Sequence, residues 1–229
     1  MAKIDNVLSR IPLSSIRVGG ELGARMRVNV EGRLKAVDVG RLTAPFIDRR
    51  NPDRFDRAWI GEHAGKFLDA AARAAVNSGD AGLRAKADQC VAALIRAQAE
   101  DGYLGTLPDA ARWGDWDLWT HKYCLIGLLS YWTEFGDARA RNAGHRIGVL
   151  LAGLFGASGR SLASIGPHMG MASTSILEPV CALFEATRDQ RLLAFAEHIG
   201  AAIDEGDGPR VVSTLLALGD VHRTANGKA

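Results

Sequence analysis

The sequence predicts an all-α protein made of stacked helical hairpins, and two observations support this fold class. From Trp59 onward, Ala- and Leu-rich segments of about 12 to 20 residues carry apolar side chains near positions i, i+3, i+4 and i+7, the period of an amphipathic helix. Short breaks separate these segments, and they repeat in one layout around Asp80, Asp137 and Asp189. The intervals of 57 and 52 residues suit a helix, a tight turn, a second helix and a longer return.

The chemistry of the three turns agrees with the helical period. Each aspartate directly precedes a helix-forming segment, where its side chain can accept a backbone hydrogen bond as an N-cap. Glycine stands before the first two aspartates, at the position that favours a left-handed backbone after a helix, and arginine stands before the third. We therefore expect three helical hairpins, which bury their apolar faces against one another as in a solenoid or a closed ring.

The first part of the chain has a different texture. Residues 1–57 are rich in Arg, Gly, Asp and Pro and show weak periodicity, which predicts an irregular arm with one helix. The three hairpins fall within residues 58–229. The expected organisation is an N-terminal arm over 1–57 and a helical domain over 58–229.

Composition excludes several classes of partner. The 28 basic and 26 acidic residues are well mixed and give a net charge of +2, so no basic stripe predicts nucleic-acid binding. The apolar runs are too short for a signal peptide or a membrane span, which predicts a soluble, cytoplasmic chain. The three cysteines, Cys90, Cys124 and Cys181, are too far apart for a metal knuckle, and we expect reduced, buried thiols. The expected partner is a small or neutral molecule.

Two long returns concentrate the chemistry-bearing side chains. Residues 99–123 and 156–175 gather aromatic, His and Gly residues, while the tight turns carry Asp, Arg and Ala. On a helical toroid, function is expected on such loops and at the starts of the helices that follow them. Any binding site should therefore lie at this end of the hairpins.

Three tryptophans in the first return point to a sugar. Trp113, Trp116 and Trp119 follow one another at a spacing of three, which would also fit one buried helical stripe. The segment "DAARWGDWD" is a poor helix because of its glycine and three aspartates, and this favours indole rings on a loop beside carboxylates. Such a loop suits a polyhydroxylated ligand.

His121, at the predicted start of the next helix, is the central candidate for a sugar contact. A lone histidine is more often a satisfied structural group than a base or a ligand, so both roles stay open from the residue alone. Cys124, one turn later, is most simply a buried hydrophobe. Two side chains on one helical face are too few for a metal site.

The remaining candidates each have a plain structural alternative. Tyr103, in "EDGYLGT", either faces a cavity or belongs to a helix-ending turn. Glu62 and His63 head the first regular helix, where an acidic residue also favours the helix dipole. His168 lies in the glycine-flanked loop "GPHMGM".

Glycoside hydrolysis needs two carboxyl groups about 5 to 9.5 Å apart or an activated nucleophile with an acid. No carboxyl pair stands out by its spacing. A complete hydrolase that uses carboxylates such as Glu62 and Asp117 is the least favoured alternative.

Four stretches resemble the β-L-arabinofuranosidases of glycoside hydrolase family 127, in the family's order and separations. They cover about residues 58 to 204 and read "WIGEHAGKFLDAAARAA", "LIRAQAEDGYLGT", "HKYCLIGLLSYWTEFGD" and "ILEPVCALFEATRDQRLLAFAEHI". The resemblance implies an (α/α)6 barrel, of which three hairpins form about half. It also implies that His121 contacts the sugar at the −1 subsite, that Glu62 and His63 stand near it, and that the Tyr103 turn lines the same mouth.

The catalytic centre of that family has no counterpart here. Its members use a zinc-bound cysteine as nucleophile and a glutamate as acid/base, with a Glu-x-Cys pair and a further cysteine beside the nucleophile. This chain has neither a Glu-x-Cys nor a Cys-Cys pair, and Ser173 aligns with a second sugar-contacting histidine of some relatives. The resemblance thus implies an N-terminal segment with no catalytic residue and no metal ligand, with zinc expected only in a full-length relative.

Half a ring would leave hairpin faces uncovered, and this predicts self-association through the open end. The favoured function is an inactive glycosidase-like segment that binds an arabinofuranoside-like carbohydrate. The alternative is a non-enzymatic module of helical repeats that binds a protein or a carbohydrate.

Overall fold

The computed structural model describes residues 8–49, 59–204 and 208–218, and its secondary structure there is helical, without strands. This confirms the predicted all-α class. The N-terminal helices are α1 (Gly20–Val28), a π-helical continuation η2 (Asn29–Leu34) and α2 (Val39–Ile47). The remaining α-helices are α3 (Glu62–Ser78), α4 (Ala81–Ala97), α5 (Asp117–Phe135), α6 (Ala138–Phe155), α7 (Met171–Thr174), α8 (Leu177–Thr187), α9 (Gln190–Ala202) and α10 (Val211–Leu218), and two short 3-10 helices are η1 (Leu13–Ser15) and η4 (Asp109–Ala111).

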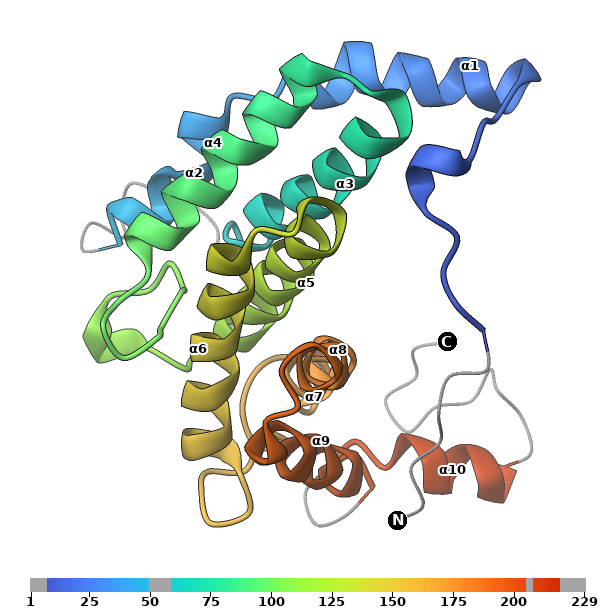
Figure 1. Cartoon of the computed structure of the whole chain (residues 1–229). Helices are drawn as coiled ribbons and strands as arrows, with labels where there is room; N and C mark the ends of the chain where they lie inside the picture. Colours follow the sequence, from blue (N-terminus) through green and yellow to red (C-terminus); the bar gives the residue numbers. More distant parts are fainter. Residues whose placement is uncertain (1–7, 50–58, 205–207, 219–229) are drawn as a thin grey trace.

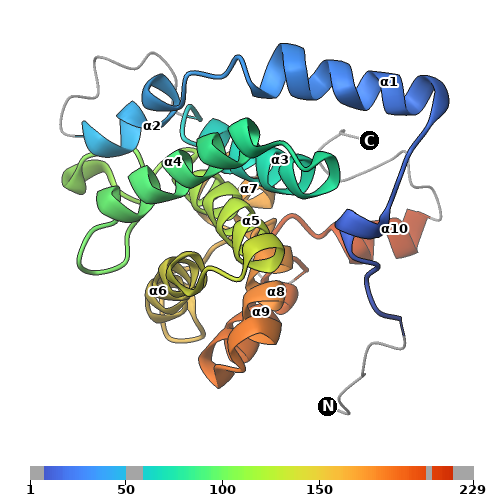
Figure 2. The same cartoon turned by 45° about the horizontal axis from the view of Figure 1, so that its top comes forward.

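Three consecutive helical hairpins form the body of the molecule. They are the pairs α3/α4, α5/α6 and α8/α9, which follow one another round an arc (Figures 1 and 2). Helix α5 packs on both α3 and α8, and α6 packs on both α4 and α9. The first helices of the hairpins therefore form one row and the second helices another, which is the arrangement of a partial helical barrel.

The turn chemistry within the hairpins is as predicted. Gly79 and Gly136 follow α3 and α5 with left-handed φ values of 73° and 72°, and Arg188 takes the same role after α8 at 58°. Each turn aspartate accepts a hydrogen bond from a backbone N–H in the first turn of the next helix. These donors are Leu83 (2.7 Å), Arg139 (2.9 Å) and Arg191 (3.0 Å).

The closest contact between hairpins is the crossing of α3 and α5, where two glycines let the backbones touch. A Cβ on Gly65 would lie 2.0 Å from the Tyr123 carbonyl oxygen, and one on Gly127 would lie 2.6 Å from the Gly65 carbonyl oxygen. Since real Cβ atoms never approach backbone so closely, neither position accepts a side chain without movement of a helix.

A continuous apolar core fills the space between the two rows of helices. Its members come from every hairpin and include Leu68, Leu83, Leu94, Leu125, Leu128, Ile147, Leu183, Leu192 and Phe195. Cys90 and Cys124 are buried in it as free thiols, as predicted. The prediction was wrong for Cys181, which is exposed on α8.

The N-terminal arm is more helical than its sequence predicts. It holds two α-helices instead of one, and Asp38 caps α2 through the Arg41 N–H (3.0 Å). Val30, Val39 and Phe46 reach the core, but the glycines and arginines between them obscure the helical period. Residues 1–7 and 50–57 of the predicted arm lie outside the described residues.

Replacing Gly65 by alanine should destabilise the fold by about 1–3 kcal/mol or more, because the new methyl group would push α5 away from α3. Gly153→Ala on α6 is the matched control, since a Cβ there meets nothing within 4 Å and should be neutral or stabilising. Urea unfolding followed by circular dichroism measures both. Equal unfolding midpoints for the two variants would contradict the close crossing.

Candidate functional site

Helix α5 begins at Asp117, four residues before the predicted start at His121. The loop prediction was therefore wrong for Trp119, which lies in the first turn of a helix. The early start of the helix is explained by the Asp117 side chain, which turns back to accept a hydrogen bond from the Trp113 N–H (2.8 Å). This contact closes the preceding turn and lets the helix start early.

The His121 side chain is fully buried behind the N-terminal turn of α5. Its Nδ1 donates to the Asp117 carbonyl oxygen (2.8 Å), and its Nε2 accepts from the Leu104 N–H (3.1 Å). Burial lowers the pKa of His121, which keeps the ring neutral, as this pair of contacts requires. Both ring nitrogens are thus engaged within the chain, and His121 ties α5 to the turn that follows α4.

Tyr103 is also buried, and it belongs to the same structural unit. Its hydroxyl donates to the Asp117 carboxylate (3.0 and 3.1 Å) and accepts from the Leu107 N–H (3.3 Å). Burial raises its pKa, so the phenol keeps its proton. A Cβ on Gly105 would lie 2.3 Å from this hydroxyl, which explains the glycine. Of the two roles open for Tyr103, the structure shows the one in a turn.

The three tryptophans of this region face two different environments. The Trp113 ring packs against Tyr103, His121 and Phe155, with centroid distances of 5.2, 5.2 and 5.4 Å. Trp116 and Trp119 pack on each other instead, at 5.6 Å. The inward tryptophan completes the core, and the other two contribute to a surface.

That surface combines aromatic rings with charged side chains, and we call it the inner-face cluster. It consists of Glu62 and Lys66 of α3 and of Trp116, Trp119, Lys122 and Tyr123 at the start of α5. The Glu62 carboxylate accepts hydrogen bonds from Trp119 Nε1 and from Lys66 Nζ, the latter at 2.7 Å. The Lys66 ammonium lies 4.4 Å from the Tyr123 ring centroid, and the Lys122 ammonium 4.4 Å from that of Trp119.

Further predicted residues lie at the edge of this cluster. The His168 ring meets the Trp116 ring edge-on, with 5.6 Å between the centroids. The Trp59 ring also meets the Trp116 ring edge-on, with a centroid distance of 6.2 Å. His63 Nδ1 lies 3.7 Å from a Glu62 oxygen, and its side chain is 51% exposed. The structure therefore brings together Glu62, His63, Trp119 and His168 and places Tyr103 and His121 behind them.

Sequence reasoning missed the two lysines of the cluster. Lys66 stands four residues after Glu62 on α3, a spacing that signals an ion pair. Lys122 is half-buried, and burial lowers its pKa, while Glu178 of α8 acts in the opposite direction. No signal in the local sequence marks Lys122, because its surroundings come from three different helices.

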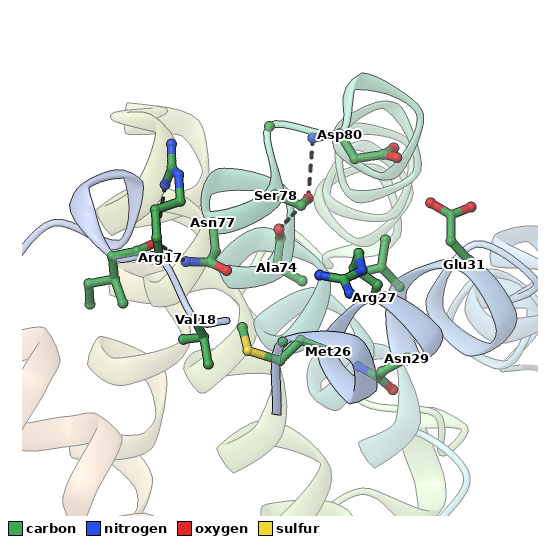
Figure 3. Close-up of a pocket in the computed structure, with 14 residues that line it drawn as sticks. Arg17, Val18, Met26, Arg27, Asn29, Glu31, Ala74, Asn77, Ser78 and Asp80 are labelled. Atoms are coloured by element: carbon green, nitrogen blue, oxygen red, sulfur yellow. Dashed lines mark hydrogen bonds between the residues drawn. The ribbon is translucent and has the colours of Figure 1, made fainter. Parts of the chain in front are cut away.

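Two cavities flank α3 at its opposite ends. One of about 470 Å³ borders the cluster through Glu62, His63 and Lys66 and is lined on its other side by the N-terminal arm. The other, of about 610 Å³, lies between α1 and the C-terminal turn of α3, where Arg27, Asn77 and Asp80 line it (Figure 3). Since α3 has 17 residues, about 25 Å separate the two ends.

The side chains of this region do not fit a zinc-thiolate centre. No three His, Cys, Asp or Glu side chains gather in a way that could hold a metal anywhere in the described ranges. Burial raises the pKa of Cys90 to about 12 and raises that of Cys124 as well, and a protonated thiol is neither a metal ligand nor a nucleophile.

Comparison with known proteins agrees with this fold. The chain resembles a GH127 beta-L-arabinofuranosidase from Geobacillus stearothermophilus T6, with a TM-score of 0.59 and 18% identity over 87% of this chain and 32% of the other. A second GH127 beta-arabinofuranosidase structure gives a TM-score of 0.60 and 16% identity over 82% of this chain and 33% of the other. Such identities show a shared fold, and the chain spans about a third of the length of either structure.

Sequence comparison adds the family. None of the curated proteins matches the chain. In the part that the structure describes, no helix is long and apolar enough to cross a membrane. The profile of the beta-L-arabinofuranosidase GH127 catalytic domain matches residues 27–204, most of the chain and more than the predicted 58–204. The chain therefore belongs to the GH127 β-L-arabinofuranosidase catalytic-domain family.

Proposed function

We propose that this chain supplies the sugar-binding face of a glycoside hydrolase similar to β-L-arabinofuranosidases. The observation that carries the proposal is the inner-face cluster. In it, the ring centroids of Trp119 and Tyr123 lie 5.1 Å apart, beside a carboxylate and two ammonium groups. Family membership supports a carbohydrate ligand, and the arabinofuranosidase activity of the related structures supports an arabinofuranoside-like one.

The chemistry of the cluster suits a small neutral sugar. Aromatic rings offer flat apolar surface to the C–H face of a sugar ring, and Lys66 and Lys122 offer donors to its hydroxyls. Glu62 offers the acceptor. The two positive charges are matched by Glu62 and by Glu178 nearby, so the cluster has no excess charge that would select an anion.

We infer that catalysis requires residues beyond this chain. Glu62 is held by an indole and an ammonium group, and Asp117 is buried against Tyr103, so neither carboxylate is placed as a free acid or base. The zinc-bound nucleophile of the family would come from elsewhere in a full-length relative. We further propose a cytoplasmic location, which the three free cysteines support.

The open side of α8 favours a second function, that of an interaction module. Glu178, Cys181, Ala182 and Glu185 are all exposed and share one face of this helix at spacings of three and four. In a complete ring of hairpins this face would be covered. We propose that it mediates self-association, or pairing with another helical hairpin, when it is free.

Trp119→Ala should weaken binding of L-arabinose about tenfold. The stacking of one aromatic ring contributes about 0.5–1.5 kcal/mol, and the change also removes the indole N–H that donates to Glu62. Isothermal titration or NMR shift perturbation measures the dissociation constant. Trp132→Ala, at the far end of the same helix, is the matched control and should leave the affinity unchanged. Equal losses in both variants would place the sugar elsewhere.

His121→Ala separates a structural from a sugar-contacting role. Because the change leaves the buried Leu104 N–H without its acceptor, we expect the free energy of unfolding to fall by about 1–3 kcal/mol. Direct sugar contact by His121 stays a prediction, and it requires a loss of affinity in the folded variant under stabilising conditions. An affinity equal to that of the wild type would remove His121 from the site.

The isolated chain should not hydrolyse an aryl β-L-arabinofuranoside, with or without added zinc. Release of the aryl group, followed by absorbance, is the measurement. Turnover that survives a chelator and disappears in Glu62→Gln would contradict the proposal and favour a carboxylate mechanism within this chain.

A further inference from the structure

The side chain of Asp117 connects the buried aromatic core to the inner-face cluster. It is 2% exposed, and its carboxylate accepts hydrogen bonds from the Tyr103 hydroxyl and from the Trp113 N–H. Burial raises its pKa, against the effect of these donors. A buried carboxylate is retained only where its contacts are specific, and here they join two ends of one loop.

The loop that Asp117 holds is strained. Trp113 and Asp115, on either side of Gly114, adopt left-handed φ values of 71° and 46°, which are unfavourable for residues with side chains. The Asp117 N–H also donates to the Gly114 carbonyl oxygen (3.0 Å). Backbone and side chain of one residue thus close this turn from both sides, and without the carboxylate the turn would relax.

The strained turn places Trp116. This residue directly precedes α5, and its ring makes edge contacts with Trp59, Trp119 and His168. It is the member of the inner-face cluster that lies in the loop before α5, and its contact with His168 links α5 to the second return. A change in the Trp113–Asp115 backbone would therefore move the ring that joins these elements.

We propose that Asp117 is a positioning residue, which holds Trp116 in its place on the sugar-binding face without touching the sugar. The role rests on the proposed function, since it assumes that the inner-face cluster binds a sugar. What matters is the acceptor oxygen that holds the Trp113 N–H. Asparagine at this position keeps such an oxygen, and its amide can donate to the Tyr103 hydroxyl, which in turn can donate to the Leu107 carbonyl oxygen 3.4 Å away.

The experiment compares Asp117→Ala, Asp117→Asn and the control Asp137→Ala. Asp137 also accepts a backbone hydrogen bond, as the N-cap of α6 and far from the cluster, so its removal lowers stability without acting on the loop. Amide hydrogen exchange at Trp113 reports the turn, and titration with L-arabinose reports the site. We expect Asp117→Ala to speed exchange at Trp113 and to weaken sugar binding, each at least tenfold. Both other variants should stay within threefold of the wild type.

The two readouts separate the possible failures. If the wild type binds no sugar, the proposed function fails, while faster exchange in Asp117→Ala alone would still support the role in the turn. Unchanged exchange in Asp117→Ala, or unchanged affinity in a protein that binds sugar, overturns the proposal. If Asp117→Ala does not fold, Asp117→Asn decides: a tenfold loss of affinity there would show that charge is required instead of an acceptor, and would also overturn it.

Discussion

The backbone contact between α3 and α5 sets the geometry on which the inner-face cluster depends. Gly65 lies directly against the carbonyl group of Tyr123, so the point along each helix at which the two cross is fixed. Glu62 stands one turn before the glycine and Trp119 one turn before the tyrosine, and this brings the carboxylate onto the indole nitrogen. A bulkier residue at the crossing would separate the helices and the two halves of the cluster together.

Behind that crossing, polar side chains take the place of ordinary apolar packing. Asp117, Tyr103 and His121 are buried next to one another, and each finds its partners within the loop before α5 or within α5 itself. Burial of such groups is costly unless every donor and acceptor is matched. These buried polar contacts hold a loop in which two residues with side chains adopt left-handed φ values.

The hairpins and their turns could be predicted from the sequence, because the signals are local. Asp137 caps the helix that directly follows it, and Gly136 adopts the left-handed conformation that its position suggests. The family could be inferred from four stretches, and the match over residues 27–204 extends it into the arm. The division at residue 57 stays a prediction.

The burial of the candidate residues could not be predicted, because it depends on contacts between distant positions. Tyr103 finds its acceptor 14 residues later, and Trp119 finds Glu62 across 57 residues. The sequence pattern around a histidine or tyrosine beside a binding loop does not tell whether its side chain faces the ligand or supports the loop. The early start of α5 has a different, local origin, since the Asp117 side chain that fixes it accepts from the Trp113 N–H only four residues before it.

The exposure of Cys181 makes the open side of α8 chemically distinguishable from the rest of the molecule. The other two thiols are fully buried, so a maleimide or a spin label would attach at this position and leave the core intact. A label at Cys181 would sit beside Glu178 and Glu185 on the exposed face of the helix. The rate at which the label reacts with Cys181, measured with and without a candidate partner chain, would report whether that chain buries this face.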